Sequence, residues 1–218
     1  MNDYIGENIK AVLFDHDDTL VGTIGPKWEQ HKYVARTFYG KTITDSQLML
    51  HWGKPLGELV CSLYGTENAE QALSNNYTCY EQYPKVLFPC TIPALLHIRR
   101  MGKLTGIVTA TTRFSLEYDF DMYQILREMI DYIQTAEDTS YHKPDPRVFD
   151  LARSWLAERE IMPEQVLYVA DGIHDMRAAV GADFNFLGVE TGLVDAAEFR
   201  KAGASSIPSL ASLILDST

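Results

Sequence analysis

The chain has 218 residues and a formal net charge of −11, a length that suits one domain of ordinary size with a smaller insertion. Hydrophobic residues make up 46% and charged residues 22%, a balance typical of globular proteins. The negative charge argues against nucleic acid as a partner, because nucleic-acid-binding proteins neutralise phosphates with clustered Lys and Arg. It is compatible with a small phosphorylated substrate held at a local cationic site.

The sequence also indicates where the protein works. No apolar run approaches the roughly 20 residues that span a bilayer, and no basic segment followed by an apolar stretch marks a secretory signal at the N-terminus. The three cysteines, Cys61, Cys79 and Cys90, leave one over in any pairing, so we expect free thiols in a reducing compartment. We therefore expect a cytoplasmic protein without a membrane partner, and both a monomer and a homodimer stay open.

Short apolar segments alternate with helical patterns along most of the chain. The first segment, residues 11–14, ends abruptly in the polar run Asp15–Thr19, as a buried parallel strand does at its carboxyl end. Four later segments have the same character: residues 105–109, 131–135, 166–171 and 184–189. Helical patterns lie between them, at residues 92–101, 146–158 and 173–180. This alternation predicts a doubly wound α/β fold with a Rossmann-like parallel sheet, which binds ligands beyond the carboxyl ends of its strands.

Residues 22–85 break this alternation. The stretch shows no strand pattern, and helical patterns cover residues 28–39, 45–52, 56–64 and 68–83. Pro84 and Pro89 flank the return to the sheet pattern. We therefore expect an inserted α-helical cap domain at residues 22–85 and an α/β core made of residues 1–21 and 86–218.

Two carboxylates follow the first predicted strand. Asp15 and Asp17 are two residues apart, so their side chains leave the same side of the chain. Carboxylates held that close repel each other unless a cation or a shared proton lies between them. One can attack phosphorus and form an aspartyl phosphate, while the other protonates the leaving oxygen and later deprotonates water. Asp15 is the predicted nucleophile and Asp17 its acid/base partner.

Three further groups of residues fit phosphate chemistry. Asp171 and Asp175 lie where a predicted strand turns into a helix, and clustered carboxylates favour a hard cation, Mg²⁺ in particular when phosphate is present. Lys143 lies on a proline-flanked turn and is suited to hold a phosphate oxygen. Thr109 ends a predicted strand, and its hydroxyl with the next amide, that of Ala110, can donate to the same phosphate. The set predicts Mg²⁺ as cofactor and a small phosphorylated metabolite as substrate.

These motifs resemble those of the haloacid dehalogenase superfamily of aspartate-nucleophile phosphotransferases. The run Asp15–Thr19 looks like the family's DxDxT motif, and Thr109 matches the Thr/Ser of its second motif. Lys143, followed by Pro-Asp-Pro, matches the third motif, and Asp171 with Asp175 matches the acidic fourth. The four motifs occur in order over nearly the whole chain. With the helical insertion, they are similar to the branch that includes phosphoglycolate phosphatases.

The resemblance implies a role for each acidic residue. Asp15, the backbone carbonyl of Asp17 and Asp171 would bind Mg²⁺, and Asp175 would support the site. One departure concerns Asp18, which stands where glycine is frequent in the family. It adds negative charge beside the nucleophile but removes no reacting group.

Three other residues are candidates for substrate specificity. Lys54 lies in Trp52-Gly53-Lys54-Pro55, between two predicted helices of the insertion, where the family places its specificity loop. Arg113, just beyond the second motif, can bind the far end of a substrate. His16, between the two catalytic aspartates, points to the opposite side of the chain, toward the insertion or a packed surface.

The leading prediction is hydrolysis of a small phosphomonoester, with alternatives left open. Asp17 argues against a dehalogenase, which attacks carbon and needs no acid/base at this position. A sugar-phosphate mutase shares every core residue. A phosphonate-cleaving relative would use a lysine of the insertion, such as Lys54, as a Schiff-base former. A binding module could keep the fold without turnover, although Asp15, Asp17 and Lys143 are all present.

Overall fold

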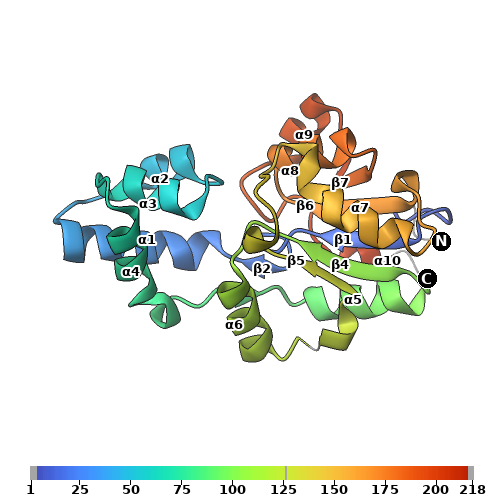
Figure 1. Ribbon diagram of the computed structural model, residues 1–218, viewed down its shortest axis with the longest axis horizontal. Coiled ribbons are helices and arrows are strands. Elements are labelled where there is room, and N and C mark those ends of the chain that lie inside the picture. The colour runs from blue at the N-terminus through green and yellow to red at the C-terminus, as the bar shows by residue number, and fades with distance from the viewer. Residues whose placement is uncertain (1–3, 126, 216–218) are drawn as a thin grey trace. The chain divides into compact units, whose positions relative to one another are not determined.

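The computed structural model describes residues 4–125 and 127–215, and these form two units (Figure 1). The first comprises the described residues of Met1–Gly22 and Leu87–Thr218, and the second is Thr23–Val86. The ends of the predicted core, residues 1–3 and 216–218, lie outside the described residues. Within the described part of the chain, no helix combines the length and the apolar character needed to cross a membrane.

A parallel sheet of six strands forms the centre of the first unit. Its order across the sheet is β5-β4-β1-β6-β7-β8. The strands are β1 (Ala11–Phe14), β4 (Leu104–Val108), β5 (Tyr132–Gln134), β6 (Val166–Ala170), β7 (Asn185–Val189) and β8 (Ser206–Ile207). The chain builds one half of the sheet from β1 outward and then returns to the other side of β1. In open α/β sheets, ligands generally bind beside such a reversal, at the carboxyl ends of the strands.

Strand β1 is buried on both faces, which explains its unbroken apolar run. Successive side chains point to opposite faces, so Val12 and Phe14 join one apolar core and Ala11 and Leu13 the other. The register pairs Phe14 with Ile107 of β4 and Val169 of β6. The residues that follow these three strands therefore meet at one edge of the sheet.

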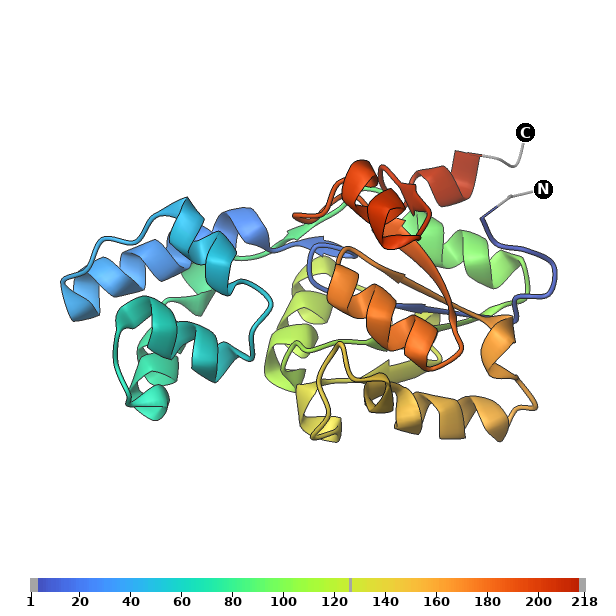
Figure 2. The same ribbon diagram turned by 90° about the horizontal axis from the view of Figure 1, so that it is seen from above.

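Helices cover both faces of this sheet, as Figure 2 shows. They are α5 (Thr91–Arg100), α6 (Arg113–Tyr123), α7 (Asp150–Ala157), α8 (Ile173–Gly181), α9 (Ala196–Ala202) and α10 (Ser212–Leu215). Side chains of α5, α6 and α10 belong to one apolar core, and those of α7 and α8 belong to the other. The predicted doubly wound, Rossmann-like architecture with a helical insertion is confirmed.

Short 3₁₀ turns complete the connections of both units. They are η1 (Tyr80–Gln82), η2 (Arg127–Met129), η3 (Ala136–Asp138), η4 (Pro146–Phe149) and η5 (Pro163–Gln165). The predicted helix over residues 146–158 is thus divided between η4 and α7, because the fixed backbone of Pro146 suits a helix start.

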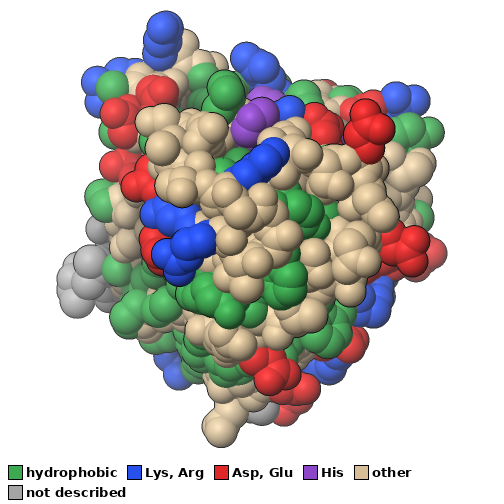
Figure 3. All heavy atoms as spheres, turned by 90° about the vertical axis from the view of Figure 1, so that its left-hand side faces the viewer, with side chains coloured by type: hydrophobic (Ala, Val, Ile, Leu, Met, Phe, Trp, Pro, Cys, Tyr) green, Lys and Arg blue, Asp and Glu red, His purple; other side chains and the backbone are tan. Residues whose placement is uncertain are grey.

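The second unit contains four helices: α1 (Ile24–Tyr39), α2 (Asp45–His51), α3 (Leu56–Tyr64) and α4 (Ala69–Tyr77). Local sequence sets their ends. Gly40 and Gly65 adopt the left-handed conformation that terminates α1 and α3. Thr44 and Gln47 form a capping box at the start of α2. On the face drawn in Figure 3, Lys and Arg side chains are interspersed with Asp and Glu side chains, as on an ordinary solvated surface.

Three details differ from the prediction, the first being strand β8, which lies outside the five predicted strand segments. Helix α4 ends at Tyr77 instead of continuing to residue 83, because the Thr78 hydroxyl donates to the Asn75 carbonyl (2.7 Å) and a turn follows before η1. The segments β2 (Val21–Gly22) and β3 (Val86–Leu87) pair as a two-stranded sheet. Strands of two residues are too short for their alternation to be visible in a sequence.

Candidate active site

The predicted nucleophile directly follows the central strand. The Asp15 amide donates to the Val169 carbonyl (3.0 Å), which extends the hydrogen-bonding of β1 with β6 by one residue. The side chain of Asp15 is buried, and one of its oxygens accepts a hydrogen bond from Lys143 Nζ at 2.6 Å. The backbone of Asp15 is therefore fixed by the sheet, and its carboxylate is fixed by the ammonium group of Lys143.

A tight turn after Asp15 orients the second carboxylate. The His16 carbonyl accepts from the amides of Leu20 (2.9 Å) and Val21 (3.2 Å). Asp18 has a φ of 53°, in the left-handed region where glycine is the usual residue and aspartate is tolerated. This conformation is the physical reason why a glycine is frequent there. The Asp17 carboxylate accepts a hydrogen bond from the Thr111 hydroxyl, in the loop after β4.

Lys143 connects two of the predicted acidic residues. Its Nζ lies 2.6 Å from an oxygen of Asp15 and 2.6 Å from an oxygen of Asp175, and its side chain is 11% exposed. Asp175 is itself buried on the first turn of α8 and accepts from the Tyr168 hydroxyl at 3.4 Å. Burial disfavours the ammonium, but the charges of Asp15 and Asp175 outweigh it and hold the pKa of Lys143 well above its usual value.

Negative charge exceeds positive charge at this edge of the sheet. Burial, together with the charges of Asp175 and Asp17, raises the pKa of Asp15 to about 6, although Lys143 lowers it. Burial and repulsion from Asp175 and Asp15 also raise the pKa of Asp171 well above its usual range. Both carboxylates thus have a free-energy cost of ionisation that an additional cation would reduce.

The residues present fit a bound Mg²⁺. Asp15 and Asp171 offer hard carboxylate oxygens, and the Asp17 carbonyl offers a third oxygen. Among residues 4–125 and 127–215, no three His, Cys, Asp or Glu side chains converge as a ready metal cluster. Mg²⁺ needs fewer, since it commonly takes one or two carboxylates and keeps several waters or substrate oxygens. The raised pKa of Asp171 reflects the excess of negative charge that such an ion would compensate.

The predicted phosphate-binding residues lie together. Thr109 is buried at the end of β4, and its hydroxyl oxygen accepts from the Thr111 amide at 3.0 Å. Ala110, which follows, is exposed. Thr109, Ala110 and Lys143 line one small pocket. The structure therefore brings the second and third motifs to a common surface beside Asp15.

The loop after β7 contains two residues that the sequence interpretation did not identify. The Thr191 hydroxyl donates to the Asp18 carbonyl at 2.5 Å. Gly192 lies so near Asp171 that an added Cβ would be 1.9 Å from a carboxylate oxygen. The signal that could have identified this loop is its position, because it follows a predicted strand at the same carboxyl edge as Asp15 and Asp171.

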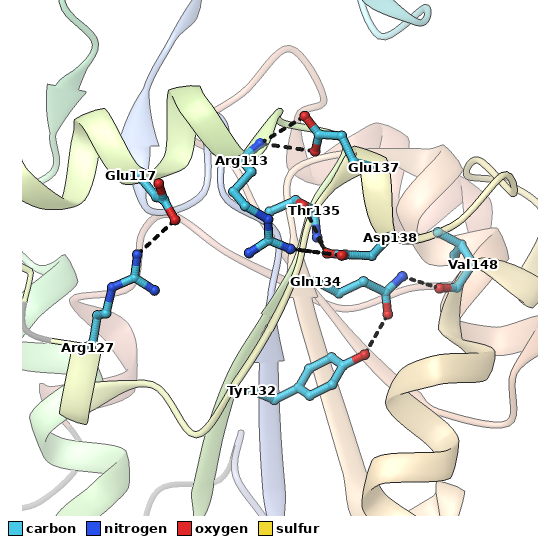
Figure 4. Close-up of polar contacts among 9 residues, drawn as sticks. All are labelled: Arg113, Glu117, Arg127, Tyr132, Gln134, Thr135, Glu137, Asp138 and Val148. Atoms are coloured by element: carbon cyan, nitrogen blue, oxygen red, sulfur yellow. Dashed lines mark hydrogen bonds and ion pairs between the residues drawn. The ribbon is translucent and has the colours of Figure 1, made fainter.

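The three specificity candidates lie in different environments. Lys54 is exposed in the second unit and pairs with Glu58 at 2.7 Å. Arg113 donates to both Asp138 oxygens at 2.8 Å, and its amide donates to the Glu137 carboxylate (Figure 4). The role of these two residues in specificity stays a prediction.

The environment of His16 corrects its place among the specificity candidates. The ring is fully buried in the first unit, with Nε2 2.8 Å from an oxygen of Asp119. It faces a packed surface, which was one of the two expected directions. A side chain with 0% exposure offers no surface to a substrate.

The structure thus brings Asp15, Lys143 and Asp175 into direct contact at the carboxyl edge of a parallel α/β sheet. A family model described as haloacid dehalogenase-like hydrolase matches residues 12–189. The chain therefore belongs to the haloacid dehalogenase-like hydrolases.

Individual relatives cover nearly the same length. The chain is 28% identical over 192 residues to validoxylamine A 7'-phosphate phosphatase of Streptomyces hygroscopicus subsp. limoneus, covering 84% of this chain and 86% of the relative. It is 24% identical over 186 residues to pyrophosphatase PpaX of Anoxybacillus flavithermus, covering 84% of each. A crystal structure from Bacteroides fragilis, of a protein assigned to the same hydrolases, shares 29% identity and superposes with a TM-score of 0.77, over 91% of this chain and 96% of the other.

Proposed function

We propose that the protein hydrolyses a small phosphomonoester through a phosphorylated Asp15. The observation that carries this proposal is the buried Asp15 carboxylate, 2.6 Å from Lys143 Nζ, with the neighbouring Asp17 carboxylate held by the Thr111 hydroxyl. Two relatives are named for the hydrolysis of a phosphate ester and of pyrophosphate. Both names support a substrate that contains a phosphoryl group.

The reaction uses the two aspartates in two steps. An oxygen of Asp15 attacks phosphorus, the bond from phosphorus to the leaving oxygen breaks, and Asp17 donates its proton to that oxygen. Asp17, now ionised, takes a proton from water as the water oxygen attacks the phosphorus of phospho-Asp15. The acyl-phosphate bond breaks, inorganic phosphate leaves, and both aspartates return to their starting states.

Lys143 and the loop after β4 hold the transferring group. The Lys143 ammonium, kept protonated by Asp15 and Asp175, offers positive charge to a phosphate oxygen. The Thr109 hydroxyl and the Ala110 amide, beside Lys143 in one pocket, donate to the same group. Since phosphoryl transfer is accelerated mainly by positioning and by charge neutralisation, this arrangement supplies both.

Asp15, Asp171 and the Asp17 carbonyl would hold Mg²⁺, which supplies further neutralisation of phosphate charge when bound. The pKa of Asp15 is raised by its surroundings but stays below neutral pH. With a pKa of about 6, most of the Asp15 carboxylate is already available for attack at neutral pH. Asp175 acts indirectly, because its 2.6 Å contact holds Lys143 beside Asp15.

The test is phosphate release from a generic aryl phosphate and a panel of small phosphate esters, with Mg²⁺ and with a chelator. We expect metal-dependent turnover by the wild type and its loss in Asp15→Asn. Asp121→Asn, an exposed aspartate on α6, is the matched control. Turnover that survives Asp15→Asn would contradict the aspartyl-phosphate mechanism. The absence of turnover on every ester would instead favour the binding-module or phosphonate-cleaving alternatives.

A further inference from the structure

A buried polar pair involves the residue between the two predicted catalytic aspartates. His16 separates Asp15 from Asp17 in the sequence, and its ring is buried in the first unit. There His16 Nε2 meets an oxygen of Asp119 at 2.8 Å, with side-chain exposures of 0% and 1%. The ring also lies near Phe120, with centroids 6.5 Å apart. A buried polar pair generally contributes no more to stability than apolar side chains of similar volume, so stability alone does not account for it.

The pair connects helix α6 to the turn that carries the catalytic carboxylates. Asp119 is the seventh residue of α6 (Arg113–Tyr123). The His16 carbonyl accepts hydrogen bonds from the amides of Leu20 and Val21, and these bonds close the turn. Fixing the His16 side chain therefore fixes the direction in which the residues on either side of it project.

The same helix reaches the turn a second time. Thr111, just before α6, donates its hydroxyl to the Asp17 carboxylate. Thr112 accepts from the Ser115 amide at 3.3 Å and caps the helix. Asp119 of α6 and Thr111, two residues before its start, therefore contact two consecutive residues of the turn, His16 and Asp17.

Helix α6 is itself anchored at its first residue. Figure 4 shows the Arg113 guanidinium bonded to Asp138 and its amide directed at Glu137. The Asp138 carboxylate also accepts the Thr135 amide at 2.7 Å, at the end of β5. These hydrogen bonds attach the start of α6 to the residue that follows β5, so the helix is a stable support for the turn.

We propose that Asp119 is a positioning residue that acts through His16 to orient the Asp17 and Asp15 carboxylates for the chemical step; this rests on the phosphatase function proposed above. The pair joins His16 to α6, whereas Lys143 contacts Asp15 and Asp175. Its loss therefore lowers kcat. A displacement of about 1 Å in a catalytic group reduces rates by about 100-fold.

The test is a double-mutant cycle with His16→Phe, Asp119→Leu and the combined variant, and Asp121→Asn on the same helix as the control. Each single change removes one side of the 2.8 Å contact and lowers stability, whereas the combined change removes both polar groups and recovers most of the loss. We expect the combined variant to melt close to the wild type, with kcat reduced about 10- to 100-fold and KM within about twofold.

A combined variant with wild-type stability and wild-type kcat would overturn the proposal, since the pair would then be only a packing feature. If the combined variant does not fold, two polar variants decide. Asp119→Asn keeps a side chain that reaches Nε2 and retains most of kcat, whereas Asp119→Ser is too short and loses it. Equal kcat in these two variants would overturn the proposal as well.

An assay without turnover separates this proposal from the proposed function. Amide hydrogen exchange of the peptide that covers residues 15–21 should be faster in the combined variant, or in Asp119→Ser, than in Asp121→Asn. A wild type that releases no phosphate would contradict the phosphatase function alone. Unchanged exchange in residues 15–21 would contradict the positioning role, whatever the wild type hydrolyses.

Discussion

The replacement Asp15→Asn should abolish activity and, in the absence of metal, make the protein more stable. The Asp15 carboxylate is buried beside Asp175 and Asp17, and its pKa rises from 3.8 to about 6 even though Lys143 lies 2.6 Å away. Desolvation and repulsion therefore outweigh the attraction to the lysine. Asparagine has nearly the same shape without the charge, so the variant lacks this cost of ionisation.

The size and the pH dependence of this gain follow from the raised pKa. A pKa of about 6 in the native state against 3.8 in the unfolded state corresponds to about 3 kcal/mol at about pH 7.5. Between about pH 4 and 6 the native protein binds more protons than the unfolded chain, so wild-type stability falls as the pH rises through this window. At about pH 4 the native Asp15 is largely protonated, and the two proteins should differ by less than about 1 kcal/mol.

Urea unfolding in a chelating buffer, at about pH 4 and about pH 7.5, measures both values. We expect Asp15→Asn to gain about 1–3 kcal/mol over the wild type at the higher pH, while Asp121→Asn follows the wild type at both. Excess Mg²⁺ should narrow the difference, because the wild type binds it more tightly than the variant. A variant less stable than the wild type at the higher pH would refute the reasoning, since the Lys143 contact would then outweigh the desolvation of Asp15.

Two further substitutions test other parts of the site. Gly192→Ala places a methyl group 1.9 Å from an Asp171 oxygen, so we expect the Mg²⁺ concentration for half-maximal activity to rise about tenfold. Its control is Gly57→Ala, where the methyl meets nothing within 4 Å, and equal Mg²⁺ dependence of the two would contradict the inference. Lys143→Met removes the buried ammonium and should lower kcat about 10²- to 10³-fold. Without Lys143 the pKa of Asp15 rises further, so the acid limb of the pH–rate profile should move to higher pH, and an unmoved limb would count against this role of Lys143.

The sequence was sufficient to predict five of the six strands of the sheet, because these are short and mainly apolar segments. The sixth, β8, has two residues and was not predicted. The segment Ala11–Phe14 ends at a charged run, and that boundary coincides with the end of β1. Local patterns are less informative where tertiary contacts decide an element's length. Helix α4 stops at Tyr77 although the helical pattern continues, and the two-residue strands β2 and β3 have no periodicity to detect.

Residue types and strand ends were enough to list Asp15, Lys143 and Asp175, but their mutual contacts depend on the fold. Nothing in the sequence places Lys143 2.6 Å from both carboxylates, because the three residues come from separate segments. For His16, the sequence predicted the direction of the side chain but not its partner. Its alternation predicted the correct direction, away from the catalytic pair, yet its partner Asp119 is 103 residues away and carries no local signal.

The structure suggests that stability and catalysis make opposite demands on neighbouring atoms of one turn. Asp15 faces a group of carboxylates in which its ionisation is unfavourable. Attack on a phosphoryl group, or the binding of a cation, would relieve this cost, so the site gives up stability for reactivity. A turn under such repulsion requires support from the protein interior. Asp119 of α6 and Thr111, just before that helix, can provide it through their contacts with His16 and Asp17, whereas Lys143 and Asp175 belong to other segments. The charged contacts would then set the reactivity of Asp15, and the contacts from α6 would set the direction in which it and Asp17 act.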